Sequence, residues 1–246
     1  MYFDFRVYIG RGFDGTVQSA EGLLRSMDEL EIEAALVCPL RPISYNLVDA
    51  NEQLAASIRE FPDRLVGAAR IDPWQPSAAN SLEHAVGRLG LRALYLNPWE
   101  EHFRADMGLL DPLMEIAQAA ELPVLISAGY PWLSEALQVC SLAQRWPGVE
   151  IVMTNGGQIN ISGLGQADAT LAMQKASNLH IDTAGVYRQD FIEETVEYFG
   201  SQRVLFGSGA PYFDQRYEIK RCLLADVAEK DRQNMLTGNA RRLLHH

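Results

Sequence analysis

Four side chains suited to anion binding and acid–base chemistry lie at or near the ends of short apolar runs. Arg6 and Tyr8 alternate in the first run, and Asp72 and Asp182 lie near the ends of two later ones. A guanidinium can hold a carboxylate in a bidentate manner, a phenol can donate a proton, and a desolvated carboxylate can act as a general base. The pattern predicts that Arg6 binds a small carboxylated molecule, with Tyr8, Asp72 and Asp182 as candidate catalytic residues.

A simpler explanation accompanies each of these four. Because a buried arginine requires a partner, Arg6 could instead pair with Asp4, Asp72 or Asp182 and neutralise an acidic interior. The two aspartates could equally be cap or turn residues that precede the following helices.

Other polar residues close further apolar runs, and we expect them to line the same pocket. They are Tyr95, Asn97, Ser127, Asn155 and Ser208. His102 follows in a loop that could fold over this pocket and exchange protons near neutral pH. A catalytic pair of Cys38 and His102 is also conceivable. The alternatives are that the polar side chains only satisfy one another's hydrogen bonds, that His102 is a surface histidine, and that Cys38 is a buried thiol without a catalytic role.

Elements that would bring these residues together are evident in the hydrophobic pattern. Strand-like runs alternate with amphipathic segments such as 19–32, 51–61, 109–122 and 193–200. The runs are 3–9, 33–39, 64–70, 91–97, 122–128, 149–155, 179–185 and 203–209. Parallel strands buried on both faces give such apolar runs. Eight of them without a linker predict a single (β/α)8 barrel over residues 1–246, whose active site would lie at the C-terminal ends of the strands.

The overall composition excludes several classes of function. The 246 residues carry 21 Lys and Arg against 32 Asp and Glu, a net charge of −11. So acidic a surface repels phosphate backbones and anionic lipids, which argues against nucleic-acid and membrane partners. Three separated cysteines, with neither a signal peptide nor a long apolar run, favour a cytoplasmic protein. His245 and His246 resemble the remnant of a purification tag and are given no role.

Several strand ends together resemble one family. The stretches FDFRVYIG (3–10), LPVLISAG (122–129), VMTNGG (152–157), HIDTAGV (180–186) and VLFGSGAP (204–211), with GNARRLL (238–244), are similar in order and spacing to the amidohydrolase-related group of the amidohydrolase superfamily. The resemblance spans nearly the whole chain. It implies a TIM barrel with a metal-dependent hydrolase or decarboxylase site.

The positions at which that family binds metal differ in this chain. The resemblance places Arg6 and Tyr8 at the two histidines of the first strand, Ser127 and Asn155 at later histidines, and Gly209 at the aspartate of the eighth strand. Arginine has no lone pair to donate, and the hydroxyl and amide side chains are poor ligands for zinc-class metals. We therefore expect no metal ion, no other cofactor and no metal-activated hydrolysis.

Two functions remain open at this stage. The first is a non-catalytic role, in which the barrel binds a small carboxylated molecule or acts beside a catalytic partner subunit. The second is a metal-independent enzyme that performs lactone hydrolysis, isomerisation or decarboxylation by acid–base chemistry. A homo-oligomer is expected by analogy with the family.

Overall fold

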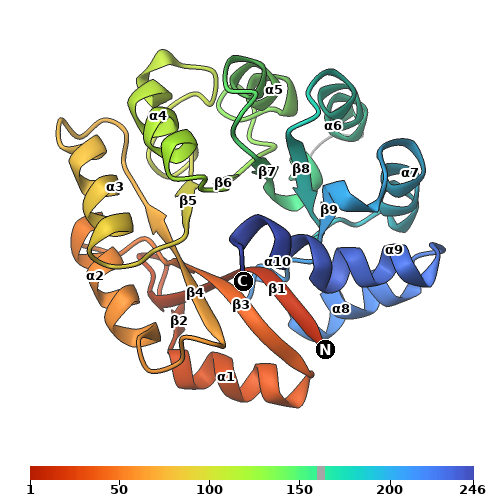
Figure 1. Ribbon diagram of the computed structural model, residues 1–246, viewed down its shortest axis with the longest axis horizontal. Helices are drawn as coiled ribbons and strands as arrows, with labels where there is room; N and C mark the ends of the chain where they lie inside the picture. The colour runs from red at the N-terminus through yellow and green to blue at the C-terminus, as the bar shows by residue number, and fades with distance from the viewer. Residues whose placement is uncertain (160–163) are drawn as a thin grey trace.

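A computed structural model describes residues 1–159 and 164–246, and shows a ring of strands surrounded by helices (Figure 1). The strands in the described residues are β1 Tyr2–Arg11, β2 Val17–Gln18, β3 Ile32–Pro39, β4 Leu65–Arg70, β5 Ala93–Leu96, β6 Val124–Ile126, β7 Ile151–Met153, β8 Leu179–Asp182 and β9 Val204–Leu205. The α-helices are α1 Ala20–Glu29, α2 Leu47–Ile58, α3 Ala78–Gly87, α4 Asp111–Ala119, α5 Ala136–Arg145, α6 Leu164–Lys175, α7 Gln189–Phe199, α8 Gln215–Leu224, α9 Glu229–Gln233 and α10 Asn239–Leu244. Short helical turns lie at η1 Gly108–Leu110, η2 Thr154–Gly157, η3 Ser201–Arg203 and η4 Asn234–Gly238.

The strands form one sheet that closes on itself. Their order is β2-β1-β3-β4-β5-β6-β7-β8-β9, parallel from β1 onward, with β2 as an antiparallel addition at the edge of β1. The segment after β9 returns to β1, where the Phe5 amide donates to the Phe206 carbonyl and the Gly209 amide to the Arg6 carbonyl, both at 2.8 Å. The predicted (β/α)8 barrel is therefore confirmed, with β2 as an addition that the hydrophobic pattern did not indicate.

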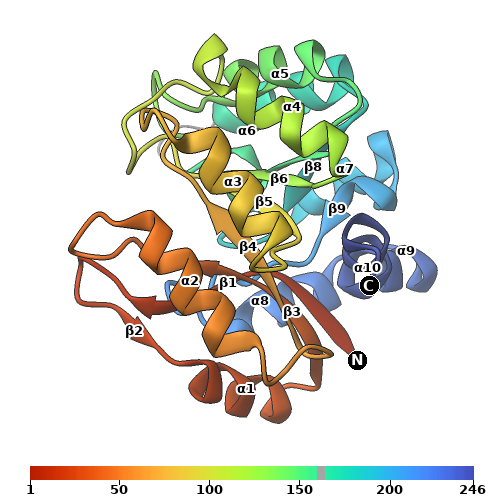
Figure 2. The same ribbon diagram turned by 60° about the vertical axis from the view of Figure 1, so that its left-hand side comes forward.

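The inside of the barrel is packed and is closed at one end. Large side chains such as Phe3 and Phe5 fill it together with smaller residues from the other strands. Leu243 and Leu244 of α10 belong to the same interior cluster, and α10 lies beside the start of β1 in both views (Figures 1 and 2). Because α10 blocks the N-terminal end of the strands, a ligand can enter only at the opposite end.

An irregularity in β1 turns two functional side chains toward that open end. Phe3 and Phe5 pack inside the barrel, whereas Val7 and Ile9 pack outside it against the helices. The pairing register with β3 shifts between Asp4 and Val7. A bulge of this kind changes the face to which the following side chains point. It places Tyr8 inward, two residues after Arg6.

Local signals explain where the helices begin. The side chain of Ser19 accepts a hydrogen bond from the Gly22 amide at 3.1 Å and caps α1. The helix expected from residue 51 begins earlier, at Leu47, because the Asn46 side chain caps the Asp49 amide. None of the helices in the described residues is both long enough and apolar enough to cross a bilayer.

Candidate ligand-binding site at the barrel mouth

A cavity of about 410 Å³ opens at the C-terminal ends of the strands. Its lining includes six of the polar residues that were expected there, namely Arg6, Tyr8, Tyr95, Asn97, Ser127 and Asn155. This is the end of a TIM barrel at which ligands and substrates bind. The structure therefore brings these six side chains together around one cavity, and their roles stay predictions.

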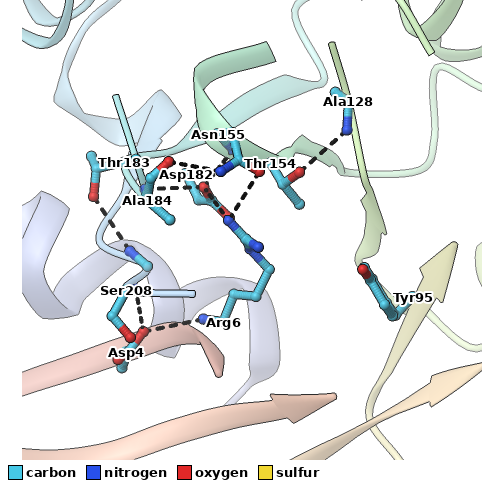
Figure 3. Close-up of polar contacts among 12 residues, drawn as sticks. Asp4, Arg6, Tyr95, Ala128, Thr154, Asn155, Asp182, Thr183, Ala184 and Ser208 are labelled. Atoms are coloured by element: carbon cyan, nitrogen blue, oxygen red, sulfur yellow. Dashed lines mark hydrogen bonds and ion pairs between the residues drawn. The ribbon is translucent and has the colours of Figure 1, made fainter. Parts of the chain in front are cut away.

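Arg6 forms a buried ion pair with Asp182 on the floor of the cavity (Figure 3). Its Nε donates to Oδ2 of Asp182 at 2.6 Å, and its Nη2 donates to Oδ1 at 3.2 Å and to the side-chain oxygen of Asn155 at 3.3 Å. Nη1 donates to the Tyr8 hydroxyl at 2.8 Å. In the described part of the chain Tyr8 is the only acceptor for Nη1, so one N–H of Arg6 is unused.

Asp182 has little capacity left for other chemistry. Besides Arg6, its Oδ1 accepts from the backbone amides of Asn155 at 2.7 Å and Ala184 at 3.2 Å. Asn155 adopts a left-handed conformation (φ 57°) that aims this amide at the carboxylate, and its side chain in turn donates to the Ala184 carbonyl. The expectation that Asp182 acts as a general base is thus corrected, because its oxygens already accept four hydrogen bonds. The simpler explanation, that it neutralises Arg6, describes the geometry.

Tyr8, Tyr95 and Asn97 continue this floor as a row of hydrogen bonds. The two phenol oxygens lie 3.1 Å apart, and the Asn97 amide nitrogen donates to Tyr95 at 3.2 Å. The side-chain oxygen of Asn97 accepts from a backbone amide, which fixes which end of its amide group faces Tyr95. Burial raises the pKa of both tyrosines, so both stay protonated at neutral pH. Since one hydrogen bond joins two hydroxyls, one O–H is left without an acceptor among the described residues.

Aromatic side chains form the wall and rim of the cavity. The rings of Trp99 and Tyr130 stack at 5.2 Å with an angle of 9° between their planes. Phe13, Tyr212 and Phe213 also line the opening. Flat apolar faces of this kind favour a planar ligand, which would lie against them while its polar atoms reach the floor.

The cavity also contains a second buried cation, Arg70, which was not among the site residues predicted from the sequence. Arg70, at the end of β4, lines the cavity and is 2% exposed. Its Nη2 donates both to Glu100 at 2.5 Å and to Glu101 at 2.6 Å, while Asn51 binds its backbone N–H and carbonyl. The available signal was an arginine that ends a strand run, with two adjacent glutamates after the next run.

Four of the expected site residues do not line the cavity, and one of them is Asp182, which is completely buried behind Arg6. Asp72 forms a local turn by accepting from the backbone amide of Trp74 and the side chain of Gln75, so its expected role as a general base in the mouth is corrected. His102 is exposed outside the lining, whereas Cys38 is buried in the interior cluster, so the geometry does not support a Cys–His pair. Ser208 is completely buried below the cavity.

Ser208 connects the first and last strands instead. Its backbone N–H donates to Asp4 at 2.7 Å (Figure 3), and its hydroxyl accepts from the Ala210 amide. The second oxygen of Asp4 accepts from Gln215 at 3.0 Å. Burial raises the pKa of Asp4 to about 6, against these hydrogen bonds, which lower it.

The donor set of this mouth does not fit a divalent transition metal. Arg6 has no lone pair, and Asp182 is paired with Arg6 and accepts four N–H hydrogen bonds. Among residues 1–159 and 164–246, no three His, Cys, Asp or Glu side chains come together as a cation site. A Cβ on Gly209 would lie 3.0 Å from Phe213 and 3.5 Å from Nη1 of Arg6, at a φ of +67°. An aspartate at position 209 would therefore be strained and crowded.

Comparison with known proteins decides the family. The sequence profile of the amidohydrolases matches residues 43–245. The chain belongs to the amidohydrolase family. The match begins after β1, the strand in which Arg6 and Tyr8 occupy the positions that the resemblance assigns to histidines.

Individual relatives are distant in sequence and close in fold. A gamma-resorcylate decarboxylase from Polaromonas sp. strain JS666 is 22% identical over 89% of this chain and 85% of its own length. A 2,6-dihydroxybenzoate decarboxylase solved with 2,6-dihydroxybenzoate has a TM-score of 0.78 at 17% identity, covering 100% of this chain and 98% of that one. A dihydroxybenzoic acid decarboxylase from the same Polaromonas strain, solved with manganese and 2-nitroresorcinol, has a TM-score of 0.76 at 17% identity. The match covers 99% of this chain and 96% of that one. At these identities the structures establish the barrel fold.

Proposed function

We propose that this amidohydrolase-family barrel binds a small carboxylated aromatic molecule in its mouth, without a metal ion of the family type and in a non-catalytic role. The observation that carries the proposal is the Arg6–Asp182 ion pair on the cavity floor. It fills the position where metal ligands are expected, and among the described residues it leaves one N–H of Arg6 and one tyrosine O–H without an acceptor. A carboxylate supplies the acceptors that these two donors lack.

The aromatic part of the ligand is inferred from the wall and from the relatives. Trp99 and Tyr130 offer a stacked face next to the polar floor. The relatives named above are decarboxylases of dihydroxybenzoates, one of them solved with its carboxylate ligand. 2,6-Dihydroxybenzoate is therefore the first ligand to test, with resorcinol as a probe of the same ring that lacks the carboxylate.

Two measurements test this proposal. Elemental mass spectrometry of dialysed protein, expressed with added zinc and manganese, should find background metal; about one equivalent per chain would contradict it. Isothermal titration should then show binding of 2,6-dihydroxybenzoate and much weaker binding of resorcinol. Replacing Tyr95 by phenylalanine keeps the ion pair and should weaken binding, whereas replacing the exposed Arg25 by methionine should leave it unchanged. Equal affinity for both ligands would refute the assigned role of the floor.

A metal-independent enzyme is the second candidate, and Glu100 favours it. This carboxylate lines the same cavity as Tyr8 and Tyr95, so a proton acceptor and a proton donor are available to one ligand. Isomerisation, lactone hydrolysis and decarboxylation are the reactions that such a pair could support. Release of CO₂ from 2,6-dihydroxybenzoate by metal-stripped protein, lost in Glu100→Gln, would favour the enzyme over the binding protein.

A further inference from the structure

The cluster of Arg70, Glu100 and Glu101 holds more carboxylate groups than it has cations to balance them. Both glutamates bind the same nitrogen, Nη2 of Arg70, at 2.5 and 2.6 Å, so their bound oxygens lie close to each other. Glu101 is 3% exposed, and its second oxygen has no hydrogen-bond partner among the described residues. A buried carboxylate oxygen without a donor is costly when charged and much less so when protonated.

Charges around this cluster add to the imbalance. Burial is the main cause that raises the pKa of Glu101, to about 7; Arg70 opposes it, and Glu100 and Asp72 add to it. Arg6 brings no surplus positive charge, because Asp182 pairs with it. Asp14 contributes a further carboxylate at the rim. Arg41, whose guanidinium lies over the rings of Phe13 and Tyr45, is a third cation beside this cluster. The three arginines thus face five carboxylates, those of Asp14, Asp72, Glu100, Glu101 and Asp182.

The same cluster faces the place where a ligand would bind. Glu100 and Arg70 both line the cavity, and Arg70 lies over the ring of Tyr95, with 5.5 Å between its guanidinium carbon and the ring centroid. The charge of Glu100 adds to burial in raising the pKa of Tyr95 and of Tyr130. A negative charge bound beside Tyr8 and Tyr95 would therefore repel the carboxylates of Glu100 and Glu101.

We propose that the Glu100–Glu101 pair takes up a proton when a carboxylate binds in the mouth, so that the ligand enters as an anion together with a proton. This inference rests on the proposed function and specifies how the same site accommodates the charge. The proton binds a carboxylate oxygen of Glu101, which cancels one negative charge of the pair and removes the penalty on the unpartnered oxygen of Glu101.

Titration of 2,6-dihydroxybenzoate at pH 7 in buffers of different ionisation enthalpy measures the uptake. A group half protonated before binding and fully protonated afterwards takes up about half a proton per ligand. Between pH 7.5 and 8.5 the affinity should fall up to about tenfold, while the ligand carboxylate stays ionised throughout. Glu101→Gln should reduce the uptake to near zero. The exposed Glu83→Gln, on α3, should retain the wild-type value.

The possible outcomes separate the inference from the function on which it rests. Binding without proton uptake in the wild type, or with uptake that persists in Glu101→Gln, overturns the inference and leaves the binding function standing. Absence of binding at every pH overturns both. Should Glu101→Gln fail to fold, the less buried Glu100→Gln tests the same pair, since it removes the other carboxyl group and should also reduce the uptake.

Discussion

Breaking the Arg6–Asp182 ion pair should be among the most damaging single changes to this barrel. Both side chains are almost completely inaccessible, at 5% and 0% exposure. In Arg6→Met the carboxylate of Asp182 keeps two backbone N–H donors and loses the cation that pairs with it. Removing one partner of a buried pair costs about 3–5 kcal/mol. For a protein of this length that corresponds to a fall in melting temperature of about 6–20 °C.

A double-mutant cycle distinguishes this cause from simple loss of packing. In Arg6→Met/Asp182→Asn no charge is left uncompensated. The double variant should therefore lower the free energy of unfolding by only about 0–2 kcal/mol relative to the wild type. Urea unfolding followed by tryptophan fluorescence gives the four free energies. A cost below about 1 kcal/mol for Arg6→Met, or a double variant as unstable as the sum of the two single ones, would refute the reasoning.

Three further changes test other parts of the structure. Tyr95→Phe removes the hydroxyl that joins the tyrosine row to Asn97 and should lower the free energy of unfolding by about 1–2 kcal/mol in urea; no loss would mean that the row contributes nothing to stability. Because burial raises the pKa of Asp4 to about 6 from 3.8, its folded form binds the proton more tightly. The free energy of unfolding should fall as pH rises from about 4 to 6, by up to ~3 kcal/mol, and Asp4→Asn should abolish this component. An Asp4→Asn variant whose free energy of unfolding depends on pH as in the wild type would contradict this role of Asp4. Gly129→Ala places a Cβ 2.4 Å from backbone atoms at a φ of +93° and should destabilise by more than ~1 kcal/mol. Gly87→Ala, with open space in α3, should be neutral or stabilising by up to ~1 kcal/mol; thermal melts that show equal effects would oppose the strain argument.

The fold and part of the cavity lining could be predicted because both depend on pattern. Strands buried on two faces read as continuous apolar runs, and the barrel then brings their ends together wherever they lie in the sequence. Arg6, Tyr8, Tyr95 and Asn97 sit in the strands or immediately beyond them, so their direction follows from the sheet. Even so, the sequence alone could not show that Asp182 would be the partner of Arg6, since that depends on which strand ends meet across the floor.

Residues beyond the strand ends were harder to place. Asp72 lies only two positions after β4, yet its oxygens are taken by a turn that depends on Gln75 and the local backbone. Ser208 falls in the segment that closes on β1, which draws it below the cavity. The cluster around Arg70 was missed because Glu100 and Glu101 reach it from a loop, and loop conformation is not encoded in hydrophobic periodicity.

Closure of the barrel joins segments of the chain that are synthesised far apart in time. Asp4 binds the Ser208 amide and the Gln215 side chain, contacts that span 204 and 211 positions of the chain. As the polypeptide leaves the ribosome, β1 is synthesised 204 positions ahead of the residue that closes on it, so the interior-facing Phe3 and Phe5 stay uncovered on that side until then. Contacts so distant in sequence slow folding and prolong the exposure of apolar surface. Demand for chaperones should therefore concentrate on the nascent chain, and a ribosome stalled before residue 206 would present an open sheet with a free edge at β1.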